Sequence, residues 1–456
     1  MARVAGVDSS TQSVKIVVRD SESGALLAQA SRPHPDGTEV DPQHWLDALE
    51  AVIAEVGGLE SLHAISIGGQ QHGMVLLDSE GEVIRPALLW NDTRSAAQAA
   101  AINAAFPDIH QRTGSQLVAS FTASKVRWVL ENEPENAARI AAIALPHDWL
   151  SWKLSGSTDA KDIFTDRSDA SGTGYFDPIN NLYISEIVEW VTGKTDVILP
   201  RIVAPGEVGA RVGDTVIASG AGDNAGAALG IGAVVGDLVI SLGTSGTAFA
   251  VSSSPSHDSS GEVAGFADVT GNFLPLACTL NAAKVFDATA KLLGIGFEEY
   301  SQLALQASPG ADGLMMAPHF DGERTPNRPD ARGAIVGITH ANFTPANLAR
   351  ASIEGVIAGL AYATEALRRE GVEISRLLLV GGAARNKAVQ EIASEIFGLP
   401  VHIPTPGEYV SEGAAIQAAW ALGGVRPRWS DNEMITIQAE PQPNVIKRYL
   451  ALISSI

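Results

Sequence analysis

The sequence predicts an α/β protein of at least two domains, and three observations support this. At 456 residues the chain is longer than one hydrophobic core usually serves. Short apolar segments with the pattern of strands alternate with helical segments along most of the chain. A turn rich in hydroxyl groups lies between apolar strands twice, at residues 8–11 and 241–244, as if one folding unit were used in each half.

Composition narrows the class of protein. The chain is 45% hydrophobic and 18% charged, which is ordinary for a folded protein and unlike a disordered one. Its formal charge of −21 would repel a phosphate backbone, so we expect no nucleic-acid partner. The single cysteine, Cys278, cannot form an internal disulfide, which fits a reducing compartment. No secretion segment opens the chain and no stretch reaches the ~18 apolar residues of a membrane span, so we expect a cytoplasmic protein without a membrane partner.

The chain opens with a predicted β-meander. Strands are expected at residues 3–7, 13–19 and 26–30, and the first turn is Asp8-Ser9-Ser10-Thr11. Such a turn can offer amide and hydroxyl groups to phosphate oxygens while its carboxylate holds a hydrated Mg²⁺. The alternative is a plain hairpin turn with local hydrogen bonds.

A glycine-flanked polar loop follows the next predicted strand. Asp41 and Pro42 are expected to cap and start a packing helix, after which a buried strand covers residues 64–67. That strand ends in a loop whose side chains include Gln71 and His72, before another strand at residues 74–77. Long polar side chains between glycines suit hydroxyl recognition in a binding site, although a solvated loop would look similar.

Residues 93–143 are mostly predicted helix, and further helices are expected to start near residues 120 and 145. Residues 165–173 form a polar loop rich in acids and hydroxyls. Such a loop either borders a sugar pocket or consists of ordinary solvated turns, and solvated turns are the simpler interpretation.

The most informative stretch is residues 219–230, in which Asp223 follows a glycine-rich turn and precedes a helix of small residues. The preceding strand is expected at residues 215–218. The flanking glycines let a substrate or a backbone come close to this carboxylate, and Asn224 beside it can donate and accept hydrogen bonds. Asp223 is therefore a candidate general base, and a helix N-cap is the alternative.

The second half of the chain repeats the pattern of an apolar strand followed by a glycine-containing turn. A strand is expected from Leu238, followed by a Ser- and Gly-rich excursion at residues 250–272 that we interpret as a turn between strands. A strand at residues 376–380 runs into the glycine pair Gly381-Gly382, which can contact an adenine or ribose face or can simply form a tight turn. The other predicted elements are a helix at 281–293, a loop at 317–327, a helix from Pro345 capped by Thr344, a helix at 387–397 and a small-residue helix at 408–424.

Two separated stretches carry a family resemblance. Residues 120–128, with Ser120, Thr122 and Lys125, are similar to the first signature of the FGGY carbohydrate kinases, and residues 333–354 are similar to the second. With five further motifs in the family's order, the chain resembles this family from Val4 to about Gly424, and most closely the xylulokinases.

The resemblance implies two ribonuclease-H-like domains of the actin and hexokinase type, with an active site in an interdomain cleft. Residues 1–232 would form the N-terminal domain, which binds sugar and part of the phosphate. Residues 233–430 would form the C-terminal, nucleotide-binding domain, and residues 431–456 a C-terminal extension. A homodimer is expected from the resemblance alone.

The resemblance also implies roles for residues. Asp223 corresponds to the catalytic base, and Asp8 to the acid that organises Mg²⁺ beside the phosphates of ATP. The implied sugar contacts are Gln71, His72 and Asn224, and the implied ATP contacts are Thr11, Gly243, Thr244, Gly381, Gly382, Ala383 and Asn386. Two positions depart from the usual pattern, since Ser10 stands where glycine is usual and Gln71 where methionine is common.

The implied reaction is ATP-dependent phosphorylation of D-xylulose to D-xylulose 5-phosphate. Three alternatives stay open: a kinase of the same family for another ketose such as ribulose, a sugar acid or a polyol; an actin-like or chaperone-like ATPase that acts on no sugar; and a sugar-binding regulator without catalysis.

Overall fold

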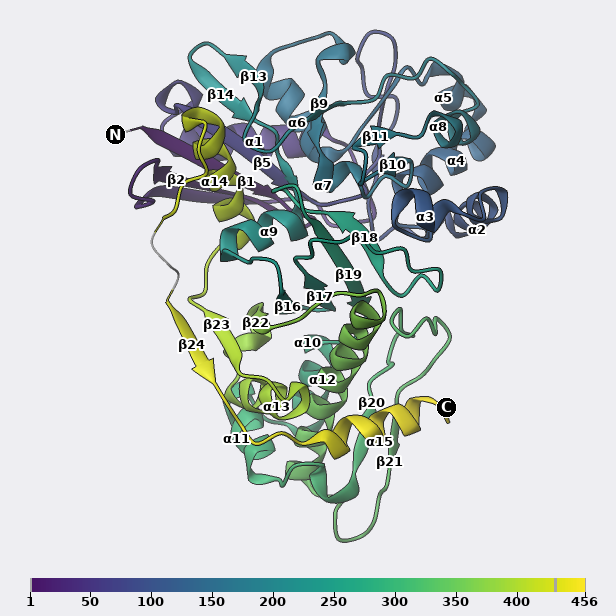
Figure 1. The fold of residues 1–456 in the computed structure, drawn as a ribbon, viewed down its shortest axis with the longest axis vertical. Coiled ribbons are helices and arrows are strands. Elements are labelled where there is room, and N and C mark those ends of the chain that lie inside the picture. The colour runs from purple at the N-terminus through teal and green to yellow at the C-terminus, as the bar shows by residue number, and fades with distance from the viewer. Residues whose placement is uncertain (1, 430–432, 456) are drawn as a thin grey trace. The chain divides into compact units, whose positions relative to one another are not determined.

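The computed structural model describes residues 2–429 and 433–455, and in it the chain divides into two units (Figure 1). The first comprises Met1–Ala233, Gly265–Leu274 and Gly407–Asp431, and the second Val234–Ala264, Pro275–Pro406 and Asn432–Ile456. Each unit holds a mixed sheet with helices packed on it, so the predicted two-domain α/β fold is confirmed. The predicted domain boundary at residue 232 stays a prediction, and the one predicted at residues 430–431 lies outside the described residues.

The sheet of the first unit has the strand order β13-β14-β5-β1-β2-β3, and β15 also pairs with β5. β1, β2 and β3 form the predicted antiparallel meander, while β5 runs parallel to β1. The alternating pattern of buried residues in β2 is that of a strand with one face on the core. The strands are β1 (Arg3–Ser9), β2 (Ser13–Asp20), β3 (Leu26–Pro33), β5 (Ala64–Gly69), β13 (Val208–Val212), β14 (Thr215–Ala218) and β15 (Ala221–Gly222).

Helices that are far apart in sequence cover this sheet. α1 (Gln43–Glu55) packs on β2 and β3 with Trp45 in the core, and α14 (Tyr409–Gly423) packs on β1 and on α9 (Asp223–Ile231) (Figure 1). α1 begins one residue later than predicted, because Pro42 occupies the cap position and the Asp41 carboxylate accepts the Gln43 amide at 3.0 Å.

The remaining helices of the first unit are α2 (Ala96–Ala105), α3 (Ile109–Thr113), α4 (Thr122–Asn132), α5 (Pro134–Arg139), α6 (Pro146–Ser155), α7 (Arg167–Ala170) and α8 (Ser185–Thr192). Its short strands are β4 (Glu39–Val40), β6 (Val75–Leu77), β7 (Ala87–Leu88), β8 (Ala142–Ala144), β9 (Phe164–Asp166), β10 (Phe176–Asp177), β11 (Leu182–Tyr183) and β12 (Arg201–Val203).

The second sheet repeats the central arrangement of the first. Its order is β18-β19-β17-β16-β22-β23-β24, with β16 antiparallel to β17 and parallel to β22, as β1 is to β2 and β5. This repeat confirms that the two hairpins are one unit used twice. The strands are β16 (Asp237–Leu242), β17 (Gly246–Ala250), β18 (Ala264–Ala267), β19 (Phe273–Thr279), β22 (Arg376–Val380), β23 (Val401–Pro404) and β24 (Met434–Ile437), with β20 (Met315–Ala317) and β21 (Ala334–Val336) forming a separate pair.

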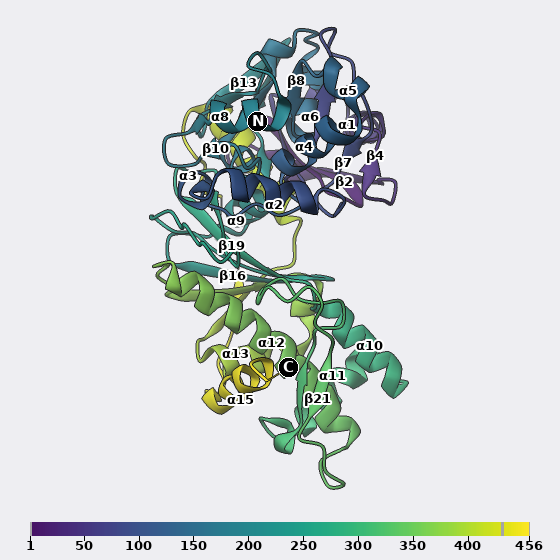
Figure 2. The ribbon, with the colours of Figure 1, turned by 90° about the vertical axis from the view of Figure 1, so that its right-hand side faces the viewer.

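The 25-residue helix α12 (Pro345–Arg369) is central to the second unit. Thr344 caps it through the Asn347 amide and Pro345 is its first residue, as predicted. α15 (Pro443–Ile453) packs on α12 and β20 (Figure 2). The other helices of this unit are α10 (Ala283–Leu293), α11 (Phe297–Gln306) and α13 (Lys387–Phe397).

Two segments differ from their predictions. Residues 165–173, predicted as a polar loop, are buried and contain the end of β9 and the helix α7, so the solvated-turn interpretation is wrong. Residues 250–272, interpreted as a turn, contain the buried strand β18, because an apolar run of four residues within the polar excursion is long enough to pair in a sheet. Within the described part of the chain, no helix combines the length and the hydrophobicity that a membrane crossing requires.

Candidate active site

Three strand ends meet at one edge of the first sheet. Asp8 of β1 pairs with Gly68 of β5, and Ala221 of β15 pairs with the same Gly68 from the other side. All three strands are parallel, so their carboxyl ends lie at this edge. Asp8 lies near the end of β1, and Gln71 and Asp223 lie in the segments that follow β5 and β15, so the structure brings all three to one edge of one unit.

Asp223 is the first residue of α9, and Gly222 occupies the N-cap position. The alternative that Asp223 is the N-cap residue is therefore wrong. Its Oδ1 accepts hydrogen bonds from the Asn224 backbone amide at 2.7 Å and from the Asn224 Nδ2 at 2.8 Å. Burial, with the charge of Asp8 as the next cause, raises the pKa of Asp223 to about 7. A carboxyl with a pKa near neutrality is suited to accept a proton.

Asp8 is buried, and its Oδ1 accepts a hydrogen bond from the Ser10 hydroxyl. Burial raises the pKa of Asp8 to about 6, although Ser10 and Lys15 act in the opposite direction. Ser10, which stands where the family usually has glycine, thus supports the carboxylate. Two neighbouring carboxyls with raised pKa values favour a bound cation, and their oxygen donors fit the preference of Mg²⁺.

Thr11 lies in the turn after β1 and connects to two neighbours. Its Oγ1 donates to the Gln70 Oε1 at 3.3 Å and accepts the Trp90 indole N–H at 2.9 Å. These two contacts hold the Thr11 hydroxyl in a defined place in the turn between β1 and β2.

Gln71 is buried and points toward the Asp223 segment. Its Nε2 donates to the Ser168 carbonyl oxygen at 3.1 Å, and a Cβ added at Gly222 would lie 2.7 Å from the same nitrogen. The glycine before Asp223 is therefore needed for this side chain to fit. Methionine, the common residue here, could not donate this hydrogen bond.

His72 has a backbone conformation that is unusual for a residue with a side chain, with φ of 69°. Its carbonyl oxygen accepts hydrogen bonds from the Thr122 hydroxyl at 3.2 Å and from the buried Lys125 Nζ at 2.9 Å. The first signature thus supports the backbone of the predicted sugar-binding loop. The His72 ring packs 4.9 Å from Phe121 and 5.5 Å from Phe266, measured between ring centroids.

In the second unit, the two predicted ATP loops lie together. Gly243 and Thr244 form the exposed turn between β16 and β17, and Gly381 follows β22, which pairs with β16. Gly381 has φ of 95°, and a Cβ added there would lie 2.5 Å from the Leu242 carbonyl oxygen. Only glycine fits this contact, so the glycine pair joins the two loops.

Gly382, Ala383 and Asn386 occupy different surroundings. Gly382 is exposed, with open space where a Cβ would be, and Ala383 is buried. Asn386 caps α13, and its Oδ1 accepts from the Val389 amide at 3.2 Å and the Ser301 hydroxyl at 2.9 Å. Flat contact with a nucleoside is thus possible at Gly382, whereas the Asn386 oxygen already has a structural role.

Residues of the second signature form a polar network around the first half of α12. Glu354 accepts the Gly310 amide at 2.8 Å and pairs with Arg350 at 2.7 Å. Asn347 donates to the Asn342 carbonyl oxygen at 2.9 Å. These contacts bind α12 to the loops before it and are structural.

The prediction of site residues missed one buried cluster in the first unit, formed by His147, Asp148, Asp166 and Asp169. His147 and Asp148 lie at the predicted start of a helix, whereas Asp166 and Asp169 lie in the segment for which solvated turns are the simpler interpretation. Two features of the sequence indicate the cluster. A histidine and an acid stand in the otherwise apolar run 145–150, and Arg167 is the one cation close in sequence to Asp166 and Asp169.

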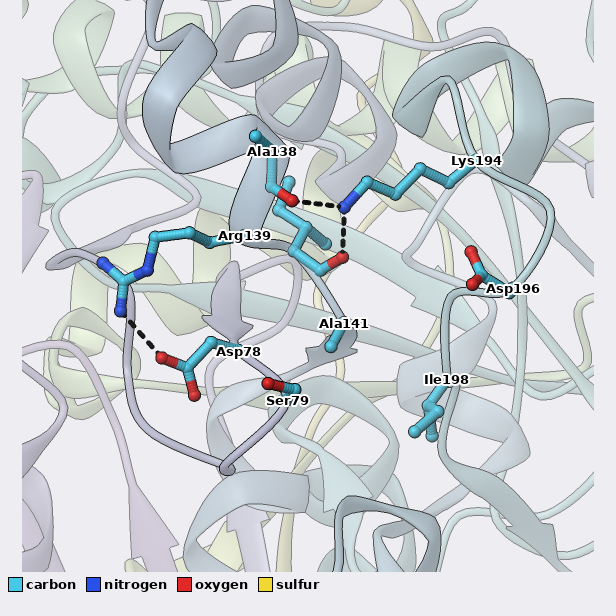
Figure 3. A pocket seen from close by; sticks show the side chains of 9 residues that line it. Asp78, Ser79, Ala138, Arg139, Ala141, Lys194, Asp196 and Ile198 are labelled. Atoms are coloured by element: carbon cyan, nitrogen blue, oxygen red, sulfur yellow. Dashed lines mark hydrogen bonds and ion pairs between the residues drawn. The ribbon is translucent and has the colours of Figure 1, made fainter.

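A surface hollow of about 630 Å³ lies elsewhere in the first unit and contains none of the predicted site residues (Figure 3). The two cationic side chains that line the hollow already have partners (Figure 3). Lys194 Nζ donates to the carbonyl oxygens of Ala138 and Ile140 at 2.8 and 2.7 Å. Arg139 forms an ion pair with Asp78 at 2.7 Å.

Comparison with known proteins identifies the family. The N-terminal domain model of the FGGY family of carbohydrate kinases matches residues 3–233, and the C-terminal domain model matches residues 238–422. The chain belongs to the FGGY family of carbohydrate kinases. The predicted family and the prediction of a kinase are therefore confirmed.

Individual members of the FGGY family are similar over nearly the whole chain. A xylulose kinase of Streptomyces coelicolor is 43% identical over 450 residues, covering 94% of this chain and 90% of that protein. The crystal structure of xylulose kinase from Bifidobacterium adolescentis is 42% identical, with a TM-score of 0.93 and 99% of each chain covered. A glycerol kinase structure from Plasmodium falciparum, at 20% identity and a TM-score of 0.88 over 100% of this chain and 97% of that one, shares the fold.

Proposed function

We propose that this kinase transfers the γ-phosphoryl group of ATP to the terminal hydroxyl of D-xylulose, giving ADP and D-xylulose 5-phosphate. The observation that carries the proposal is the position of Asp223, whose carboxyl has a pKa of about 7 at the same sheet edge as Asp8 and Gln71. The choice of sugar is supported by similarity to proteins named xylulose kinases.

In the proposed mechanism, Gln71, His72 and Asn224 orient the sugar so that its terminal hydroxyl faces Asp223. As the hydroxyl oxygen bonds to the γ-phosphorus, its proton passes to the Asp223 carboxylate, and the bond from the γ-phosphorus to the bridging oxygen breaks to release ADP. Such general-base catalysis contributes ~10² to 10⁴ in rate. Positioning supplies much of the remainder in phosphoryl transfer.

The nucleotide side is assigned to Thr11, to the Gly243-Thr244 turn and to the loop of Gly381, Gly382, Ala383 and Asn386. Asp8 would hold Mg²⁺, which neutralises charge on the phosphates when it is bound. A cytoplasmic location, expected from the sequence pattern, and a homodimer, expected from the family resemblance, belong to the same proposal.

A sugar panel tests the proposal. ADP release is measured with D-xylulose, D-ribulose, gluconate, glycerol and no acceptor at saturating MgATP. We expect the highest kcat/KM with D-xylulose and little ADP without an acceptor. A higher value with another acceptor would replace xylulose as the substrate, and ADP release independent of any acceptor would indicate an ATPase instead.

A further inference from the structure

The buried cluster of His147, Asp148, Asp166 and Asp169 has no part in the mechanism above. The His147 Nε2 lies 3.1 Å from an Asp169 oxygen, 3.2 Å from an Asp148 oxygen and 3.7 Å from an Asp166 oxygen. All four side chains are buried. Carboxylates are rarely buried together unless a cation accompanies them, because each loses its hydration.

The other side of the His147 ring contacts the strand ends that lead to the proposed sugar site. A Cβ added at Gly220 would lie 2.4 Å from the His147 Nδ1, and one added at Gly69 would lie 3.1 Å from the His147 Cβ. Gly69 leads to Gln71 and Gly220 leads to Asp223. The imidazole therefore fills the space between these strand ends and the acids.

Two of the acids, Asp166 and Asp169, belong to a short segment that connects the same elements, whereas Asp148 lies beside His147 on α6. Asp166 caps α7 by accepting the Ser168 and Asp169 amides at 2.7 and 3.1 Å. Ser168 then accepts twice, through its carbonyl oxygen from Gln71 Nε2 at 3.1 Å and through its Oγ from the Gly222 amide at 3.1 Å. One residue of α7 thus joins the sugar-binding loop to the strand that precedes the proposed base.

The same segment also reaches His72. The Gly172 carbonyl oxygen, two residues beyond the end of α7, lies 2.6 Å from the His72 Nδ1. Movement of α7 would therefore disturb Gln71, His72 and the approach to Asp223 together.

We propose that His147 is a positioning residue, which as a buried imidazolium paired with Asp169 and Asp148 fixes α7 so that Ser168 holds Gln71 and Gly222 in place beside Asp223. This inference rests on the proposed function for its catalytic consequence. Burial alone would lower the pKa of His147. The nearby charges of Asp148 and Asp169 outweigh it and raise the pKa of His147 to about 9, so the ring is charged at neutral pH. The titratable groups around the cluster are Asp148, Asp166, Asp169, Tyr175, Tyr183 and, through Asp169, Asp223.

Four variants test the inference. His147→Gln removes the charge, His147→Lys retains a cation, and Ser168→Ala removes the acceptor of the Gly222 amide. Ser151→Ala is the matched control, because Ser151 is a buried serine on α6 whose hydroxyl has no hydrogen-bond partner among the described residues. The readouts are kcat and KM for D-xylulose and for ATP, hydrogen exchange of the backbone at residues 219–226, the melting temperature and the metal content.

For His147→Gln and Ser168→Ala we expect faster exchange at residues 219–226, a kcat reduced about tenfold or more, and an unchanged KM for ATP. His147→Lys should recover most of the kcat that His147→Gln loses, and Ser151→Ala should match the parent. Rescue by a cation is not expected of a residue that only fills space.

Three results would overturn the inference: parental exchange and kcat in both His147→Gln and Ser168→Ala, equal losses in all variants including Ser151→Ala, or a stoichiometric divalent metal in the parent that is lost in His147→Gln. If His147→Gln does not fold, His147→Lys and Ser168→Ala decide. A parent protein that fails to phosphorylate D-xylulose would refute the proposed function, and the exchange data would still decide the positioning role.

Discussion

At the scale of single residues, the candidate site depends on two buried carboxyl groups and on a backbone carbonyl that accepts a hydrogen bond from a side chain distant in sequence. Asp8 and Asp223 have raised pKa values because both are desolvated and each lies near other acids. The His72 carbonyl is held by Lys125, which follows it by 53 residues. Each of these two features leads to a test.

The raised pKa of Asp223 predicts the pH dependence of the reaction. A general base must be unprotonated, so kcat/KM for the sugar should fall as the pH drops through about 7, the pKa of Asp223, and not near 4 where an exposed aspartate titrates. Initial rates at saturating MgATP between about pH 5 and pH 9 measure this limb. A rate that stays constant down to pH 5 would exclude Asp223 with this pKa as the base.

Replacing Lys125 tests the support of the sugar loop. Lys125→Met retains most of the buried chain but removes one of the two donors to the His72 carbonyl, and loss of a buried hydrogen-bond partner costs ~1 to 3 kcal/mol. We expect the KM for D-xylulose to rise at least about tenfold while the KM for ATP stays constant. The exposed Lys161→Met is the control. Equal changes in both Michaelis constants would mean that the loop is not specific to the sugar.

At the scale of elements, close packing of glycines holds α14 on the first sheet. A Cβ at Gly413 would lie 1.9 Å from the Gly226 carbonyl oxygen of α9, and one at Gly6 of β1 would lie 1.9 Å from the Ser411 carbonyl oxygen of α14. Since β1 carries Asp8 and α9 begins with Asp223, this packing sets the spacing of the two acids.

A pair of substitutions in α14 measures that packing. Gly413→Ala should reduce the free energy of unfolding by about 1–3 kcal/mol through steric overlap, and should also reduce kcat. Gly423→Ala, at the open end of the same helix, should be neutral or slightly stabilising because alanine favours the helix. Denaturant unfolding followed by circular dichroism gives both values, and equal stabilities for the two variants would contradict the packing argument.

The two loops of the second unit allow a separate test of nucleotide binding. Gly382→Leu would fill the open space at Gly382, and we expect the KM for ATP to rise at least about tenfold with stability and the KM for sugar unchanged. Gly296→Leu, at another exposed glycine of this unit with open space beside it, is the control. An unchanged KM for ATP in Gly382→Leu would remove this loop from the nucleotide site.

At the scale of the whole molecule, the two halves share one topology but differ in chemistry. The β1–β2 turn is preceded by Asp8, whereas the β16–β17 turn is preceded by Ser241 at the corresponding place. The corresponding positions of the two units therefore carry different groups, a carboxylate in the first unit and a hydroxyl in the second.

Local patterns explain which of these features could be predicted from sequence. The hairpins, the turn before Asp223 and the cap of α12 depend on residues within a few positions of one another, and these predictions are confirmed. The contacts of His147 with Asp169 and of Lys125 with His72 depend on chain segments brought together only by folding. The apolar run around His147 and Asp148 indicates that these two side chains are buried, but no short window of sequence shows which distant partners they contact.

The Asp223→Asn variant tests the central claim most directly. Asparagine keeps the shape of the side chain but cannot take the proton from the sugar. Sugar-dependent ADP formation is measured together with D-xylulose binding by calorimetry. We expect a kcat lower by ~10² to 10⁴ with sugar affinity largely retained. Turnover at the parental rate would contradict it.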